Sequence, residues 1–116
     1  MYTIVILTRP MAGMGREDFL EHYRTTHYDL ATKIPGLLYY QQAEVAHGAE
    51  GWGVGDEAFP THVGLSTYTF ASREDAEAGF ASAEGVAVDA DTGTFMDWPS
   101  VLFAPATVIQ SFGSPV

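Results

Sequence analysis

Residues 16–40 read REDFLEHYRTTHYDLATKIPGLLYY, and this stretch decides the fold. Its apolar and aromatic residues recur at spacings of three, four and seven, as on one face of a helix. This face comprises Phe19, Leu20, Tyr23, His27, Leu30, Ala31 and Ile34. Pro35-Gly36 ends the helical pattern, and Leu37–Val45 then reads as a strand. The stretch therefore predicts a helix over residues 16–32 that leads directly into a strand.

The flanking sequence supplies three more strands and a second helical region. Short runs rich in β-branched and aromatic residues predict strands at Tyr2–Thr8, Val63–Phe70 and Val101–Ile109. Pro105 indicates an edge position or a bulge, because proline cannot donate to a β-ladder. Ser72 can cap a helix over residues 73–83, Gly85 would loosen its end, and residues 86–95 can form a second, short helical piece. The order βαββαβ predicts a ferredoxin-like α+β fold, with a four-stranded antiparallel sheet and the helices on one face.

The strands carry apolar side chains on both faces of the expected sheet. Ile4 and Ile6 alternate with Val5 and Leu7 in the first strand, and the last strand shows the same pattern. A sheet with helices on only one face should instead alternate apolar and polar residues. A second copy of the chain, sheet against sheet, is the simplest cover, so the pattern predicts a homodimer. The alternative is an unusually apolar monomer, which would tend to aggregate.

The composition is that of a folded, acidic domain, and it excludes several classes of function. The 116 residues are 47% hydrophobic and carry a formal net charge of −10, with five Lys and Arg in total. This charge argues against binding to nucleic acid or to an anionic membrane. The lack of cysteine excludes disulfides, thiolate nucleophiles and Cys-ligated zinc. With no evident signal peptide or membrane span, we expect one soluble domain over residues 1–116, in the cytoplasm.

A Gly-rich connection, residues 46–62, separates the second and third strands. Connections of this length are often lids or binding loops, and Trp52 near its centre could close a pocket or simply anchor the loop. His47 and His62 flank acidic residues, but without a spacing typical of metal ligands. The chain also lacks a phosphate loop, a dinucleotide fingerprint and a nucleophile elbow. We therefore expect neither a metal nor a cofactor.

His27 is the residue that most directly indicates chemistry. It falls within the apolar face of the helix, so it should point at the sheet, where an imidazole needs a hydrogen-bond partner or a ligand. Burial would lower its pKa and leave it neutral, able to act as a base. The alternative is a core histidine bonded to a neighbouring hydroxyl. His22 lies about 120° from the centre of the apolar face and is expected to face solvent.

Three strand tyrosines are further candidates. Tyr39 and Tyr40 should lie on opposite faces of their strand, one toward the helices and the other toward the partner subunit. A phenol beside an imidazole can donate to a developing oxyanion or relay a proton. Tyr68 on the third strand could do the same. Packing alone is the alternative for all three.

Several of these residues together resemble a known family. The helix segment FLEHYRTTH at 19–27, the IPGL turn at 34–37 and Tyr40 resemble the EthD family of dimeric α+β barrel proteins. Ala90-Asp91, with Phe95 four residues later, is also similar to the family's pattern. The resemblance covers nearly the whole chain, and it implies the βαββαβ fold, the dimer and a pocket between helix and sheet.

The resemblance also implies roles for particular residues. Better-understood relatives include cofactor-free isomerases acting on methylmuconolactone, in which a histidine matching His27 and a tyrosine matching Tyr40 line the site. Those isomerases carry a cysteine near the position of Tyr68, so the resemblance does not extend to the lactone reaction itself. Other members occur with ether-degrading oxidation systems or with polyketide-modifying enzymes.

The main functional hypothesis is a cofactor-independent enzyme that isomerises, cyclises or moves a proton within a small cyclic, aromatic or polyketide-like metabolite. His27 would be the general acid or base and Tyr40 would hold an enolate. The pocket would be formed by Phe19, Tyr23, Tyr39, Trp52 and Tyr68. A cofactor-free oxygenase is a close variant. The alternatives from other classes are a non-catalytic binding or accessory protein for an oxidative system, and a purely structural dimer.

Overall fold

The computed structural model describes residues 1–46 and 61–113. The predicted lid residue Trp52 and His47 lie outside the described residues. In chain order the elements are β1 (Tyr2–Thr8), α1 (Arg16–His22), the π-helical turn η1 (Tyr23–His27), α2 (Tyr28–Ala31), β2 (Leu37–Glu44), β3 (Gly64–Phe70), α4 (Arg73–Ala81), α5 (Ala83–Phe95), the 3₁₀ turn η2 (Trp98–Ser100) and β4 (Leu102–Thr107).

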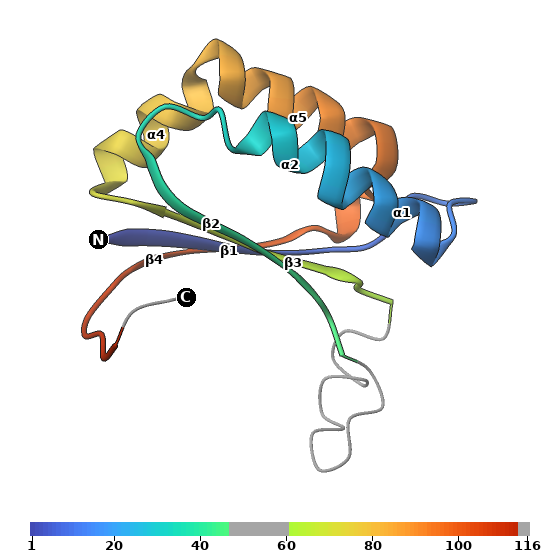
Figure 1. The fold of residues 1–116 in the computed structure, drawn as a ribbon, viewed down its shortest axis with the longest axis horizontal. Helices are drawn as coiled ribbons and strands as arrows, with labels where there is room; N and C mark the ends of the chain where they lie inside the picture. The colour runs from blue at the N-terminus through green and yellow to red at the C-terminus, as the bar shows by residue number, and fades with distance from the viewer. Residues whose placement is uncertain (47–60, 114–116) are drawn as a thin grey trace.

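The four strands form one antiparallel sheet in the order β2-β3-β1-β4. Figure 1 shows α1, α2, α4 and α5 together on one face of this sheet. The predicted ferredoxin-like α+β fold is therefore confirmed. Pro105 lies in β4, an edge strand, opposite Ile4 of β1, so the edge position that its missing N–H predicted is also confirmed.

The first helical segment runs from Arg16 to Ala31 as predicted, but it contains a π-helical turn at Tyr23–His27. Within this turn the Tyr28 N–H bonds to the carbonyl of Tyr23, five residues earlier. The same carbonyl accepts a hydrogen bond from Gln42 Nε2 of β2 at 2.7 Å. Such turns insert one residue into a helix and rotate the side chains that follow. The π turn was not predicted, because apolar spacing does not report a single inserted residue.

The second helical region breaks earlier than predicted, and its second part is longer. α4 ends at Ala81, and Ser82 caps α5 by accepting a hydrogen bond from the Gly85 N–H at 3.1 Å. Gly85 therefore lies in the first turn of α5 and does not loosen the end of α4. A Cβ at this position would lie 2.4 Å from the carbonyl oxygen of Phe80, so glycine permits this close contact between the two helices.

The core lies between the helices and one face of the sheet, in two clusters. One contains Ile4, Ala31, Ile34, Tyr68, Phe70, Ala76 and Val88. The other contains Phe19, Leu20, Tyr23, Val63, Phe95 and Met96. On the other face of the sheet Val5, Leu7 and Leu65 are only half-buried, and no helix of the described chain covers them (Figure 1). We call this surface the open face.

Candidate functional site

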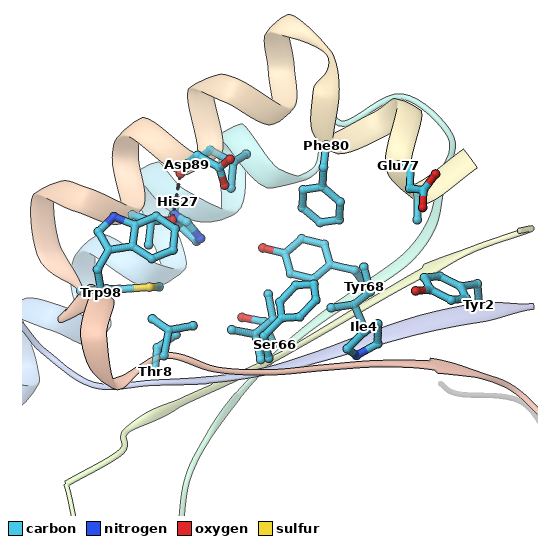
Figure 2. A pocket seen from close by; sticks show the side chains of 18 of the residues that line it. Tyr2, Ile4, Thr8, His27, Ser66, Tyr68, Glu77, Phe80, Asp89 and Trp98 are labelled. Atoms are coloured by element: carbon cyan, nitrogen blue, oxygen red, sulfur yellow. Dashed lines mark hydrogen bonds between the residues drawn. The ribbon is translucent and has the colours of Figure 1, made fainter. Parts of the chain in front are cut away.

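A cavity of about 400 Å³ lies between the sheet and the helices α4 and α5 (Figure 2). Most of its wall is apolar, with polar groups from β1, β3, η1 and α5. The lining residues are Tyr2, Ile4, Ile6, Thr8, His27, Ser66, Tyr68, Arg73, Ala76, Glu77, Phe80, Val88, Asp89, Thr92, Met96, Trp98, Val101, Phe103 and Pro105. A cavity of this volume and character suits a small organic molecule.

His27 brings an imidazole to the cavity from the end of η1 and is only 2% exposed. Its Nδ1 lies 2.9 Å from Asp91 Oδ2. A carboxylate can only accept, so Nδ1 carries the proton and donates it to this hydrogen bond. The lone pair then resides on Nε2, because Asp91 bonds to the other ring nitrogen, and Nε2 can accept a proton from a ligand. A carboxylate that orients an imidazole in this way also stabilises the imidazolium that forms when Nε2 takes up a proton.

The pKa of His27 is lowered from its ordinary value of 6.5. The main cause is burial, which disfavours the charged ring, and the nearby His22 adds to the effect. The Asp91 hydrogen bond and charge act in the opposite direction but do not cancel it. His27 is therefore neutral at pH 7, as its place in the apolar face of the helix predicted.

Phenol groups line the cavity or lie directly behind its wall. Tyr68 is 2% exposed and lines the cavity, with its hydroxyl pointing toward the side where His27 lies (Figure 2). Tyr40 packs against it with ring centroids 4.7 Å apart and accepts a hydrogen bond from Gln42 Nε2 at 2.8 Å. Tyr23 makes a short hydrogen bond to the hydroxyl of Ser66, which also lines the cavity.

Burial raises the pKa of Tyr23, Tyr40 and Tyr68. These phenols therefore remain protonated at physiological pH, and their chemistry is that of hydrogen-bond donors rather than bases. A neutral imidazole beside protonated phenols is an arrangement that can accept one proton and stabilise one developing negative charge.

Charged groups are confined to the rim of the cavity. Asp89 lies beside His27 (Figure 2). Partial burial raises the pKa of its carboxyl, while His27 acts in the opposite direction. On the far side Arg73 Nε donates to Glu77 Oε1 at 2.8 Å, so these two charges largely neutralise each other.

The structure brings together some of the predicted site residues but not all. His27 and Tyr68 line the cavity, and Tyr40 lies one side chain behind Tyr68. Phe19 and Tyr23 belong to the second core cluster and are not among the lining residues, although Tyr23 reaches the wall through Ser66.

Two further predictions concerned Tyr39 and His22. Tyr39 lies opposite Thr69, on the other face of the sheet from Tyr40, which lies opposite Tyr68. It is therefore on the open face, not at the cavity. His22 was expected to face solvent, but its side chain is only partly exposed and its Nε2 lies 2.8 Å from Asp91 Oδ1 on α5.

Sequence reasoning missed Asp91 as the partner of His27, and it missed the wall residues Ser66, Asp89 and Trp98. For Asp91 there was a usable signal. It lies three residues after Val88 and four before Phe95, both of which are buried on α5. A carboxylate on the buried face of a helix needs a polar partner, and His27 was the buried imidazole available.

Other kinds of site receive no support from the structure. Among residues 1–46 and 61–113, no three His, Cys, Asp or Glu side chains are arranged to hold a metal ion. His62, considered with the metal hypothesis, instead directs Nε2 at the backbone carbonyl of Ser100 at 2.9 Å. In the same described ranges, no helix combines the length and apolarity needed to cross a bilayer.

Solved structures with the same fold have low sequence identity to this chain. An EthD family protein from Bacillus halodurans superposes with a TM-score of 0.73 at 19% identity, covering 94% of this chain and 100% of its own. A dimeric ferredoxin-like protein of unknown function from Thermobifida fusca has a TM-score of 0.69 at 14% identity, covering 92% and 90%. SnoaB, a cofactor-independent oxygenase from Streptomyces nogalater, has a TM-score of 0.64 at 10% identity, covering 97% of each chain.

Comparison of sequences is more specific than comparison of folds, because unrelated activities can share one fold. No curated protein matches the chain. The model of the EthD domain matches residues 11–99, well over half of the sequence and including the helix, the PGL turn and Asp91. The chain is thus a member of the EthD family.

Proposed function

We propose that this protein is a cofactor-independent enzyme that moves a proton within a small cyclic or aromatic molecule, with His27 as the base. The observation that carries the proposal is the buried, neutral imidazole at the cavity wall, whose Nδ1 is held by Asp91 at 2.9 Å. A base needs a free lone pair, a fixed orientation and a means of stabilising its protonated form. Asp91 supplies the last two and leaves Nε2 for the substrate.

In the proposed reaction, an acidic C–H or O–H proton of the substrate passes to His27 Nε2. The electron pair left behind delocalises onto an oxygen of the substrate, as in an enolate. Ser66 and Tyr68 lie in the cavity wall, where their hydroxyls can donate to that oxygen, with Tyr40 supporting Tyr68 from behind. Return of the proton to a different atom gives an isomerisation. Attack of the enolate carbon on a second carbonyl gives a cyclisation, in which the alkoxide formed takes the proton back from His27 Nε2.

The apolar wall defines the class of substrate. Ile6, Phe80, Trp98 and Phe103 contribute large hydrophobic surfaces to the cavity, which favour a flat or cyclic molecule with few charges. Excluding water around Nε2 would also protect a reactive enolate. An oxygenase would share the first step; the enolate would then give its electrons to O₂, and the peroxide formed would take the proton back from His27 Nε2 to become a hydroperoxide. SnoaB is described as a cofactor-independent oxygenase, so we retain this variant.

We propose in addition that the protein acts as a homodimer. No helix of the described chain covers the open face, and the Thermobifida fusca protein of the same fold is described as dimeric.

The experiment starts with mass spectrometry of small molecules that remain bound to the purified protein. The molecule found is returned to ligand-free protein in deuterated water, and ¹H NMR follows the exchange of its acidic protons. We expect wild type to catalyse exchange and His27→Ala to lose at least about a hundredfold in rate, with little change in affinity. His62→Ala is the matched control, because His62 is also a buried imidazole but does not line the cavity.

The alternative functions give different results. A carrier or accessory protein would bind the molecule without catalysing exchange, and His27→Ala would change only the affinity. A structural dimer would retain no molecule, and no metabolite would shift its melting temperature. Either result would refute the enzymatic proposal.

A further inference from the structure

One carboxylate joins two imidazoles at the back of the candidate site. Asp91 Oδ2 lies 2.9 Å from His27 Nδ1, and Asp91 Oδ1 lies 2.8 Å from His22 Nε2. The side chains form a gradient of exposure, in which His27 is the most buried, Asp91 is 10% exposed and His22 is 30% exposed. The unit therefore extends from the cavity wall to the surface of the protein.

The π turn makes this arrangement possible. His22 and His27 are five residues apart, and in a regular α-helix that spacing places two side chains about 140° apart around the axis. The turn at Tyr23–His27 inserts one residue between them, so the two rings come to the same side of the helix. Both rings also contact Phe95, with centroids 4.4 Å and 5.1 Å away, which fixes them against α5.

We propose that His22 is a positioning residue that sets, through the shared Asp91 carboxylate, how readily His27 takes up a proton. This inference rests on the proposed function for its catalytic meaning, but the coupling itself is a property of the free protein. Asp91 brings one negative charge to two rings that can each become positive. When His22 is neutral, the full charge of Asp91 is available to stabilise a protonated His27.

When His22 is protonated, it already balances that carboxylate, and it also repels a second positive charge. His27 is then a weaker base. The side chain of His22 is 30% exposed to solvent, whereas that of His27 is buried, so solvent reaches the His22 ring more readily. The state of the surface ring would thus be transmitted to the buried one, without a proton having to pass through Asp91.

Other groups that face His27 are few, which makes the coupling measurable. From α5 these are Asp91 and Asp89, from its own helix His22 and Tyr23, and from β3 Ser66 and Tyr68. The two tyrosines and the serine stay neutral, so only Asp89 adds a further charge. It favours the protonated ring in every variant considered below.

The test is an NMR titration of the histidine rings in wild type and in three variants, without any ligand. His22→Gln keeps a donor for Asp91 Oδ1 but can no longer become positive, so the titration of His27 should move to higher pH. His22→Arg carries a permanent positive charge at the same place, so the titration should move to lower pH. Asp91→Asn removes the carboxylate and should also move it to lower pH.

The decisive result is the order of the two His22 variants: His27 should titrate at a higher pH in His22→Gln than in His22→Arg. The reverse order, or no difference between the two variants, would overturn the proposal and leave His22 with a structural role only. If one His22 variant does not fold, its counterpart still gives a signed result against wild type. Because the titration needs no substrate, it distinguishes failure of this coupling from failure of the proposed function. Once a substrate is known, the acidic limb of the rate profile should move in the same direction as the His27 titration.

Discussion

The lowered pKa of His27 has a consequence for stability that requires no knowledge of the substrate. In the unfolded chain this ring titrates near 6.5, and in the folded protein below that value, mainly because of burial. Between the two values the unfolded chain binds a proton that the folded protein does not. The contribution of His27 to stability is therefore fully present above 6.5 and is lost as the pH falls through this window.

We expect the free energy of unfolding of wild type, minus that of His27→Gln, to rise with pH across this window. One proton sets the slope at no more than about 1.4 kcal/mol per pH unit. Urea denaturation at several pH values between about 5 and 8 measures both proteins, and the groups they share cancel in the difference. A difference that falls as the pH rises would mean that folding raises the pKa of His27 instead of lowering it.

The residues of the candidate site differed in how well the sequence predicted them. The helical period placed His27 among apolar neighbours, and burial followed from that. Nothing in the sequence showed that Tyr40 would lie behind Tyr68 rather than at the cavity, because both face the same side of adjacent strands. The hydrogen bonds of Asp91 could not be predicted from the sequence, because its two partners are 64 and 69 residues away. They form only because α5 packs against the first helical segment.

At the scale of elements, the π turn is the feature that shapes the site. Gln42, on strand β2, is the residue that ties this turn to the sheet. Gln42 Nε2 donates to the Tyr23 carbonyl at 2.7 Å and to the Tyr40 hydroxyl at 2.8 Å. The first bond fixes the backbone of the turn, and the second fixes the phenol beside Tyr68. One side chain thus ties the helix that carries His27 to the strand that carries Tyr40.

We expect Gln42→Ala to lower the free energy of unfolding by about 1–3 kcal/mol, because two partly buried acceptors lose a donor. It should also speed hydrogen exchange at the Tyr28 amide, whose bond closes the π turn. Gln110→Ala, at an exposed position near the C-terminus, is the matched control and should change neither quantity. Normal protection of the Tyr28 amide in Gln42→Ala would show that the turn does not depend on the sheet.

The sequence predicted the types of the elements better than their junctions. Hydrophobic period and turn residues gave the strands and the first helix, because those signals repeat along each element. The break between α4 and α5 falls at one residue, Ser82, whose backbone is extended and whose side chain caps α5, and the π turn depends on one inserted residue. Single events of this kind leave no periodic signal, so they appear only in the folded structure.

At the scale of the whole molecule, the unpaired surface is the open face of the sheet. One row of it crosses all four strands, since Leu7 lies opposite both Leu65 and Leu102, and Leu65 also lies opposite Ala43. All four side chains are apolar. The helices occupy the opposite face (Figure 1), so no helix of residues 1–46 and 61–113 removes this row from water. The apolar side chains on both faces of the first strand had already predicted such a surface.

If a second copy covers this row, a charge at its centre should separate the two chains. We expect wild type to sediment with twice the 12.6 kDa mass of one chain, and Leu65→Glu to sediment as a folded monomer, because each chain would bury an unpaired carboxylate in the interface. Val86→Glu makes the same exchange on α5, at a side chain that is 58% exposed on the helical side, and should remain a dimer. Analytical ultracentrifugation measures the mass, and circular dichroism verifies folding. A dimer that survives Leu65→Glu, but is split by Val86→Glu, would place the interface on the helices and leave the open face without its proposed cover.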